Sequence, residues 1–455
     1  MNKKDIFKEI VRSFHKKPPA AVKKRVLELP FNSGKIITVS GVRRSGKTFL
    51  LLDAISMLMA QGVEISRIVY VNFEDERLDA DKKELDLILQ AYQELYPEAE
   101  PAKTYFFFDE IQNVDGWEKF IRRVYDTVSK NIFVTGSNSK LLSTDIATSL
   151  RGRNLGYELY PLSFAEFLSF GGINTDIHDS RNRAKIASNA EPYLLGGGFP
   201  ELFFIAQDFR IKTLQGYFDV MLFKDLIERY KRKPHAHLLK YFVKRLLANI
   251  SSPLSLHKIY NELRSQGYKI DKNLLYELME ELNSIYFFFP LRKYSASVIK
   301  RETSEKKFYA VDNGLAGAIS FSIGEDRGKL LENAVFMQFH STGSDIFFYK
   351  DKKECDFICL VPGGKPKAYQ VAYNLASADT KKRELDGLIE ACRRLGLTSG
   401  AVITMSEEFE EKIGGVRIKV VPFYKWALAC ARRPNPFGAP RQEKNGAGPG
   451  LFNSK

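Results

Sequence analysis

Apolar and polar residues follow two alternating patterns through the first third of the chain. Short apolar runs rich in β-branched and aromatic residues predict buried strands, and longer segments with one apolar face predict helices. The predicted strands span 35–40, 67–73, 103–110 and 131–138, and the predicted helices span 49–60, 78–96 and 117–129. We therefore predict an α/β core over residues 35–160, after a basic helical lead-in over residues 1–34.

The pattern changes after residue 160, where helical segments with few strands begin. Ser163 and Glu166 have the spacing of a capping box, and the glycine-rich stretch 196–200 predicts a hinge. We predict a helical lid over residues 161–234. Residues 235–311 are predicted to form a winged helix, because Ser255 and Asp271 cap two amphipathic helices and two apolar strands follow.

The last part of the chain predicts a second α/β unit over residues 312–430. Its pattern between 327 and 425 is a helix, three strands, a helix and two strands. From residue 431 the sequence is rich in glycine, proline and charged residues, so residues 431–455 are predicted to be a disordered tail.

Composition narrows the class of protein. The 455 residues are 44% hydrophobic, with a formal net charge of +14. The positive charge is concentrated before residue 61, in the predicted winged helix and in the tail, which suits nucleic acid but also an ordinary solvated surface. The four cysteines form no C-x-x-C pair, and no apolar run is long enough to span a bilayer. We expect a cytoplasmic protein that makes no membrane contact.

A phosphate-binding motif follows the first predicted strand directly. Gly41, Val42, Arg43, Arg44, Ser45, Gly46, Lys47 and Thr48 fit the P-loop pattern G-x-x-x-x-G-K-[ST]. The two glycines allow the tight turn whose N–H groups face a polyphosphate, and a helix follows at once. Lys47 is predicted to bind the phosphates of ATP, and the Thr48 hydroxyl to hold Mg²⁺.

The third predicted strand ends in two carboxylates. Asp109 and Glu110 follow the apolar run 103–108, which is the Walker B pattern. We predict that Asp109 lies beside the Mg²⁺ held by Thr48 and that Glu110 polarises the attacking water. A further strand, 67–73, lies between the P-loop and this motif, as in ATPases that carry a catalytic glutamate.

Three further residues are candidates for the same site. Asn138 ends the fourth predicted strand and is predicted to contact the γ-phosphate or the water, although a polar turn would look the same. Arg151 and Arg153 lie on a short loop. They are predicted to stabilise charge on the γ-phosphate, either in the same chain or from a neighbouring subunit, and an ordinary surface loop is the alternative.

Five segments together resemble a known family. They are the P-loop with its two arginines, Phe108–Gln112, Thr135–Asn138, Leu150–Arg153 and Pro161–Phe167. The chain between about residues 30 and 425 resembles bacterial and archaeal AAA-type ATPases that carry an uncharacterised C-terminal domain of restriction-endonuclease-like fold. The resemblance implies a P-loop ATPase core followed by a lid, a winged helix and that domain.

The nuclease-like domain departs from the pattern of active nucleases. Such enzymes hold metal with an acidic residue on the first helix, an Asp on the second strand and an E-x-K triplet on the third. The matching positions are Glu332, Asp356 and the triplet from Gln370 to Ala372. Because Gln replaces the carboxylate and Ala replaces the lysine, we expect no cleavage.

The predicted function is ATP hydrolysis with Mg²⁺ that drives a conformational change in the C-terminal half. In one version the protein acts with duplex DNA, which the winged helix contacts through a basic wing containing Arg292, Lys293, Lys300 and Arg301. The predicted recognition helix is acidic at Glu277, Glu280 and Glu281, which argues against base reading. In the alternative version the protein is a slow nucleotide switch that engages a protein partner. Either version is compatible with a homo-oligomer.

Overall fold

The computed structural model describes residues 2–431 except 20–21, 79–83, 143–147, 228–235, 269, 296, 298, 300 and 302–303. The predicted tail from residue 432 onward and Lys300 of the predicted wing therefore lie outside the described residues. Among the described residues, no helix is long and apolar enough to cross a membrane.

The predicted α/β core is confirmed as a parallel five-stranded sheet with the strand order β2-β3-β4-β1-β5. Its strands are β1 (Ile36–Ser40), β2 (Ile68–Asn72), β3 (Tyr105–Asp109), β4 (Ile132–Gly136) and β5 (Asn154–Glu158). The edge strand β5 was not predicted. Its sequence, Asn-Leu-Gly-Tyr-Glu, is mostly polar, and only Gly156 is fully buried.

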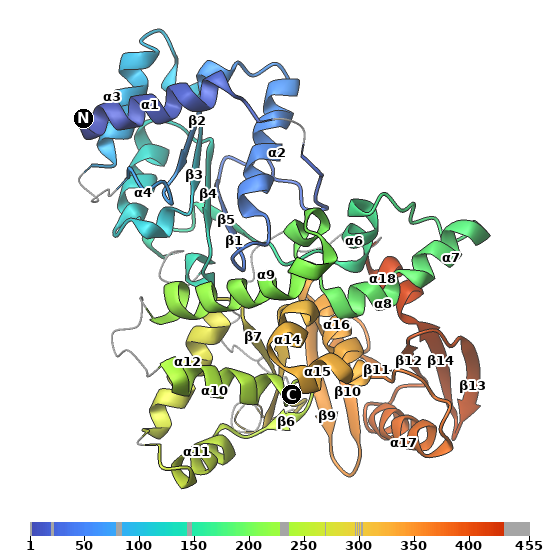
Figure 1. The fold of residues 1–455 in the computed structure, drawn as a ribbon. Coiled ribbons are helices and arrows are strands. Elements are labelled where there is room, and N and C mark those ends of the chain that lie inside the picture. Colours follow the sequence, from blue (N-terminus) through green and yellow to red (C-terminus); the bar gives the residue numbers. More distant parts are fainter. Residues whose placement is uncertain are drawn as a thin grey trace, which may run out of the picture.

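Helices cover both faces of this sheet (Figure 1). Side chains alternate along each strand, so Phe106 and Phe108 pack on one face and Phe107 packs on the other. The first face is covered by α1 (Lys3–Lys16), α3 (Asp86–Leu95) and α4 (Trp117–Thr127). The second face is covered by α2 (Lys47–Ala60), the helix that follows the P-loop.

Six helical segments follow the sheet. They are α6 (Phe164–Phe170), α7 (Ser180–Ser188), α8 (Ala190–Gly196), the 3₁₀ helix η5 (Pro200–Phe204), α9 (Gln207–Val220) and the π-helical segment η6 (Met221–Ile227). The predicted capping box is present, because the Ser163 hydroxyl accepts from the backbone N–H of Glu166 while the Glu166 carboxylate accepts from the backbone N–H of Ser163.

The middle of the chain combines three helices with a small antiparallel sheet of order β6-β8-β7. The elements in chain order are α10 (Ala236–Leu247), β6 (Pro253–Leu254), α11 (Leu256–Ser265), α12 (Lys272–Ser284), β7 (Phe288–Leu291) and β8 (Lys306–Ala310). The predicted N-cap at Asp271 is present, since its side chain accepts from the backbone N–H of Asn273.

The C-terminal part is a mixed six-stranded sheet of order β13-β14-β12-β11-β10-β9 with helices around it. Its elements are α14 (Asn313–Ile319), α15 (Phe321–Glu325), α16 (Arg327–Ser341), β9 (Asp345–Lys350), β10 (Glu354–Leu360), β11 (Lys367–Val371), α17 (Ala378–Arg394), β12 (Ser399–Thr404), β13 (Phe409–Ile413), β14 (Val416–Pro422) and α18 (Phe423–Ala431). The prediction of two strands after the second helix was wrong by one, because β13 and β14 form a hairpin there.

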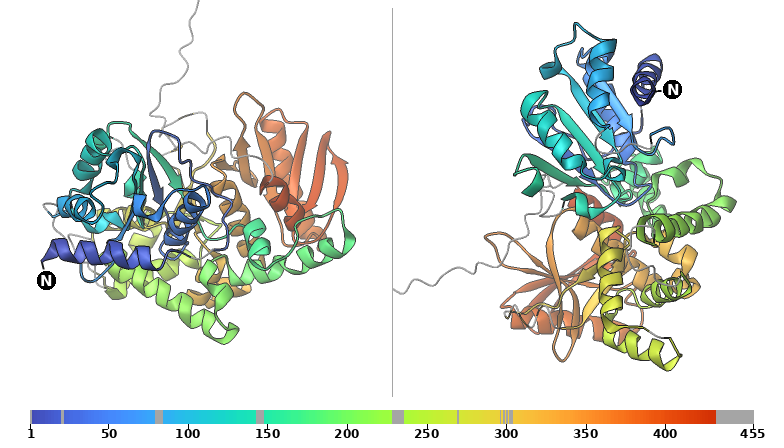
Figure 2. Two further views of the ribbon diagram at one scale, coloured as in Figure 1. Left: turned by 90° about the horizontal axis from the view of Figure 1, so that it is seen from above. Right: turned by 90° about the vertical axis from the view of Figure 1, so that its left-hand side faces the viewer.

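Packing divides the described chain into two bodies. The five-stranded sheet has hydrophobic clusters of its own, whereas one core runs from Tyr160 to Leu428 through the lid, the middle region and one face of the C-terminal sheet, and a separate cluster lies between the other face of that sheet and α17. We call residues 2–159 the ATPase body and residues 160–431 the C-terminal body. Figure 1 shows the first body above the second, and the side view in Figure 2 shows the same two-part arrangement. The predicted boundaries at 235 and 312 therefore separate kinds of element within one packed core.

Candidate functional site

The P-loop connects β1 to α2 where the ATPase body meets the C-terminal body. Gly41 packs so closely that a Cβ there would lie 2.1 Å from the carbonyl oxygen of Leu159. Gly46 has φ +98°, a left-handed conformation that other residues rarely adopt. Both glycines are thus required by local geometry, and the helix that begins at Lys47 points its positive end at the loop.

Lys47 and Glu110 form a buried ion pair across the predicted phosphate site. The Lys47 ammonium lies 3.2 Å from a Glu110 carboxylate oxygen and donates to the carbonyl oxygens of Gly41 and Val42 at 3.1 and 3.3 Å. Burial alone would raise the pKa of Glu110, but the charges of Lys47 and Arg43 and the hydrogen bond from Gln112 together lower it. Glu110 is therefore held as a carboxylate, the form in which it could accept a proton from water.

Asp109 lies at the end of β3 beneath three hydroxyl groups. Tyr70 donates to one carboxylate oxygen at 2.9 Å, Thr135 donates to the other, and Thr48 makes a further hydrogen bond. Burial raises the pKa of Asp109, and the bonds from Thr135 and Thr48 oppose that shift. The Thr48 hydroxyl and the Asp109 carboxylate are adjacent hard oxygen ligands beside the P-loop, so the residues fit a Mg²⁺ bound with nucleotide.

Gln112 is a site residue whose role the sequence did not reveal. Its side-chain amide donates to Glu110 at 2.6 Å and lies 3.4 Å from the Ser137 hydroxyl. Gly136 makes room for it, because a Cβ there would lie 2.4 Å from the Gln112 amide oxygen. Asn138 is buried two residues beyond β4, the strand between β1 and β3. The structure therefore gathers Lys47, Thr48, Asp109, Glu110 and Asn138 at the carboxyl edge of the sheet.

Arg151 and Arg153 are not part of this group. β5 runs parallel to β1, and its first residue pairs with Ile36 at the start of β1. The two arginines precede β5, and the Arg153 carbonyl oxygen accepts from the Ile36 amide at 2.8 Å. The P-loop lies beyond the opposite end of β1, about 13 Å further along the strand. The prediction that either arginine acts on a nucleotide of the same chain is therefore wrong, whereas action across a subunit interface stays a prediction.

The P-loop also contacts the C-terminal body, a contact for which no local sequence pattern provides a signal. Val42 is fully buried in the core of that body. Arg43 makes a bidentate bond to Asp225 of η6 at 3.0 and 3.1 Å. Arg44 lies 3.3 Å from Glu201 of η5. Beneath the loop, the hydroxyl groups of Ser40 and Tyr286 are 2.6 Å apart.

The nuclease-like positions do not form a metal site. Lys307 places its ammonium between Glu332 and Asp356, at 3.0 and 2.9 Å. Gln370 points elsewhere, because its amide nitrogen donates to Glu384 at 2.6 Å while its amide oxygen accepts from the Asp356 backbone. Within the described part of the chain, no three His, Cys, Asp or Glu side chains are arranged to hold a metal ion. The candidate nuclease-like positions Glu332, Asp356 and Gln370 therefore form no such group among the described residues.

The segment after β7, predicted as a basic wing, is hydrogen-bonded through its backbone to the C-terminal sheet. The backbone of Arg292 and Tyr294 exchanges hydrogen bonds with Phe348 of β9 at 3.1 and 2.7 Å, and Lys293 forms a β-bridge to the same residue. The Arg301 guanidinium lies 5.8 Å from the centre of the Phe347 ring. The backbone of this segment therefore adds to the edge of the C-terminal sheet, whereas the Arg292 side chain is exposed.

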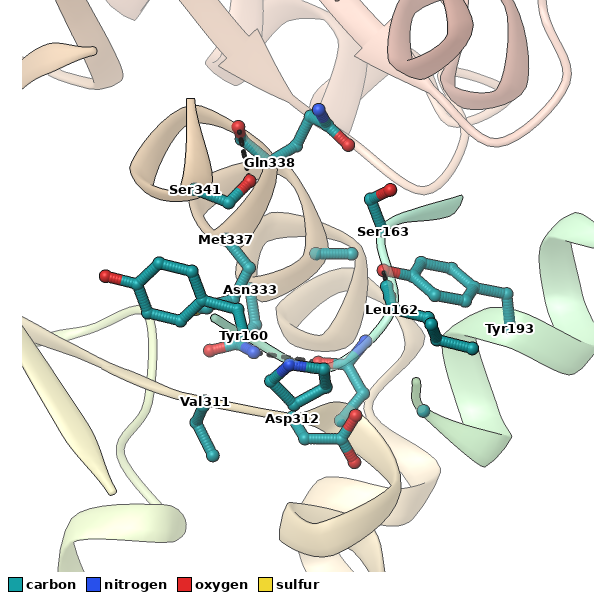
Figure 3. Close-up of a pocket in the computed structure, with 14 residues that line it drawn as sticks. Tyr160, Leu162, Ser163, Tyr193, Val311, Asp312, Asn333, Met337, Gln338 and Ser341 are labelled. Atoms are coloured by element: carbon teal, nitrogen blue, oxygen red, sulfur yellow. Dashed lines mark hydrogen bonds between the residues drawn. The ribbon is translucent and has the colours of Figure 1, made fainter. Parts of the chain in front are cut away.

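A small cavity of about 30 Å³ lies in the C-terminal body between the segment 160–163, α8 and α16 (Figure 3). Asp312 borders it and accepts hydrogen bonds from the backbone of Gly198 at 2.6 Å and of Leu315 at 2.8 Å. Burial raises the pKa of Asp312 to about 6. The cavity has room for about one water molecule, so it is not a nucleotide site.

Three family models match successive parts of the chain. They are an AAA domain over residues 33–168, a domain of unknown function (DUF8612) over residues 188–326 and a domain of unknown function (DUF4143) over residues 327–426. The AAA match supports nucleotide binding at the P-loop, typically with Mg²⁺.

Two relatives share much of this sequence. An uncharacterized protein of Methanocaldococcus jannaschii is 34% identical over 444 residues, covering 94% of this chain and 96% of the relative. An uncharacterized protein of Haemophilus influenzae is 33% identical over 324 residues, covering 71% and 79%. A solved structure of Aeropyrum pernix ORC1 in complex with DNA overlaps 71% of this chain and 92% of its own at 11% identity. Its TM-score of 0.26 is too low to indicate a shared overall fold.

Proposed function

This chain belongs to a family of archaeal and bacterial proteins in which an AAA domain precedes two domains of unknown function, and from that premise we propose that it is an ATP-hydrolysing conformational switch. The observation that carries the proposal is that the P-loop contacts both the predicted catalytic residues and the C-terminal body. Lys47, Thr48, Asp109 and Glu110 meet on one side of it, and the C-terminal body packs directly against the other.

Each residue of the site has a proposed role. Lys47 binds the β- and γ-phosphates, and Thr48 and Asp109 would hold Mg²⁺, which supplies charge neutralisation on the phosphates. When the Lys47 ammonium moves to the phosphates, the Glu110 carboxylate keeps its hydrogen bond from Gln112. This bond holds the Glu110 carboxylate toward the attacking water. Asn138 contacts the γ-phosphate or that water.

Coupling to the C-terminal body is proposed to run through the P-loop itself. Val42, Arg43 and Arg44 lie between the two glycines of the loop, so a change in loop conformation on phosphate binding changes their contacts with η5 and η6. π-helical segments such as η6 occur frequently at functional sites. The arrangements of the C-terminal body with and without bound nucleotide would then differ in the contacts of Asp225 and Glu201 with these arginines.

Within the C-terminal body we propose the lid, winged-helix and restriction-endonuclease-like regions at the predicted boundaries. The order helix, strand, helix, helix, strand, strand between 236 and 310 supports the winged helix. DNA contact is the second candidate function, favoured by the net charge of +14. The hydrogen-bonded wing segment and the exposed acidic residues Glu277 and Glu280 of α12 favour a switch that acts on a protein partner instead.

The test is the steady-state rate of ATP hydrolysis by the full-length chain with Mg²⁺, measured with and without duplex DNA. Glu110→Gln is the matched control, because it keeps the shape of the site and removes the carboxylate. We expect hydrolysis that this variant slows about 10²–10⁴-fold and that DNA leaves unchanged. Stimulation by DNA would favour the second candidate, and hydrolysis at the wild-type rate in Glu110→Gln would contradict the proposal.

A further inference from the structure

Lys307 lies at the centre of a buried cluster of charges. Its ammonium is within 2.9 Å of both Glu354 and Asp356 and 3.0 Å of Glu332. Its side chain is only 1% exposed. The lysine belongs to β8 of the middle region, Glu332 belongs to α16, and the other two carboxylates belong to β10. Three separate elements of the C-terminal body thus converge on one positive charge.

The surrounding contacts fix the cluster in place. Tyr309 shares a hydrogen bond of 2.7 Å with Glu332, and its ring stacks on Phe336 at a centroid distance of 4.0 Å. The second oxygen of Asp356 accepts from the backbone of Val371 at 3.0 Å. A buried ammonium is tolerated only when nearby carboxylates compensate for its lost hydration, and here three of them do so.

We propose that the Lys307 ammonium is a built-in cation that occupies the place a divalent metal would take in this domain, and that it closes the site as a clasp between the middle region and the C-terminal sheet. Carboxylates held this close around one point attract a cation. Here the chain supplies that cation itself, on a side chain that is only 1% exposed. The inference is independent of ATP hydrolysis.

The departure at Gln370 follows from this arrangement. A carboxylate at position 370 would add a fourth acid to the three around one ammonium, where burial and the charge of Asp356 already raise the pKa of Glu332 to about 8. The neutral amide instead accepts from the Asp356 backbone and donates to Glu384. Lys307 also cannot serve as a relocated catalytic lysine, because its ammonium is surrounded by carboxylates and buried away from a nucleic acid phosphate.

The test is Mn²⁺ binding by nucleotide-free full-length protein, followed by electron paramagnetic resonance. We expect Lys307→Ala to bind one more Mn²⁺ per chain than the wild type and to melt at a higher temperature when Mn²⁺ is added. Lys307→Ala combined with Asp356→Asn should lose that gain. The proposal would be overturned if folded Lys307→Ala bound the same number of Mn²⁺ ions as the wild type. It would also be overturned if the wild type had a Mn²⁺ site, or a DNA cleavage activity, that Asp356→Asn removes.

A second pair of variants decides the matter if Lys307→Ala does not fold. Lys307→Met removes the charge but keeps the length of the side chain, so it should lower the melting temperature. Adding Asp356→Asn to it should recover part of the loss, because one fewer carboxylate then needs a counter-charge. A double variant no more stable than Lys307→Met would show that the ammonium does not balance these carboxylates and would overturn the proposal.

Discussion

The ion pair between Arg25 and Glu166 offers a quantitative test of how the two bodies are held together. Arg25 donates to both oxygens of Glu166 at 2.8 and 3.2 Å, and the two side chains are 7% and 9% exposed. The same guanidinium donates to the carbonyl oxygens of Ser45 in the P-loop and of Tyr160 at 2.7 and 2.8 Å. One side chain therefore joins the lead-in, the P-loop and α6.

Arg25→Met keeps the aliphatic part of the side chain but removes the charge from a buried carboxylate. Removing one partner of such a pair costs about 3–5 kcal/mol of unfolding free energy. Glu166→Gln retains the capping box, because glutamine can serve at that position. The double variant buries no charge at this place, so it should be more stable than Arg25→Met alone by about 2 kcal/mol.

Urea unfolding followed by tryptophan fluorescence measures these differences. The chain contains two tryptophans, and Trp117 lies in the ATPase body while Trp426 lies in the core of the C-terminal body. A Trp117→Phe background leaves one reporter on the body that contains Glu166. The exposed pair Arg327–Glu191 of the C-terminal body, with side chains 36% and 46% exposed, is the matched control and should be worth only about 0.2–1 kcal/mol.

The result that would refute the reasoning is a cost for Arg25→Met no larger than that of the exposed control. The pH dependence gives a second check. Burial alone would raise the pKa of Glu166, but Arg25 and the hydrogen bonds around the carboxylate lower it. A folded pKa below the unfolded value means that the stabilisation is present above the unfolded value and is lost as the pH falls through the folded one. Wild type should therefore lose its advantage over Glu166→Gln in acid.

Four other perturbations have defined outcomes. Lys47→Ala should abolish ATP binding, which equilibrium binding measures. Glu110→Gln should bind ATP and hydrolyse it about 10²–10⁴-fold more slowly, which phosphate release measures. Unchanged turnover in Glu110→Gln would exclude Glu110 as the base. Arg153→Ala should leave hydrolysis by dilute, monomeric protein unchanged, so a loss seen only at concentrations where chains associate would indicate action across an interface. Burial raises the pKa of Asp312 from 3.8 to about 6. The free energy of unfolding should therefore fall by up to about 3 kcal/mol as the pH rises from about 4 to 6 and Asp312 loses its proton. Asp312→Asn should lack this slope in thermal unfolding, and identical slopes would contradict the assignment.

Local sequence signals were sufficient for the nucleotide site. The spacing of Gly41, Gly46 and Lys47 after an apolar run determines a strand, a loop and a helix, and the run before Asp109 determines the neighbouring strand. These features depend on residues close together in the chain. The edge strand β5 was missed for the opposite reason, because its polar residues carry no apolar pattern.

Long-range contacts had no such signal. Arg25 and Glu166 are 141 residues apart, and Lys307 and Asp356 are 49 residues apart. Nothing near Lys307 in the sequence distinguishes it from a solvated lysine of a basic wing. Its partners Glu332 and Asp356 were recognised as acidic residues at nuclease-like positions, but Glu354 was not, and the source of the compensating charge became visible only when β8 was placed beside α16 and β10.

In the proposed switch, distant contacts of this kind would let a small change at the P-loop move a large part of the molecule. The segment that follows the ATPase body places Tyr160 against His340 at 5.4 Å between ring centroids, and His340 packs on Phe336, which stacks on Tyr309 beside the Lys307 cluster. Close packing of this kind resists bending, so the C-terminal body should respond to the nucleotide as a unit. A displacement at the P-loop arginines would then be transmitted to the far sheet by rotation of the whole body. The surface that reads the nucleotide state can therefore lie far from the nucleotide, on any exposed face of the C-terminal body.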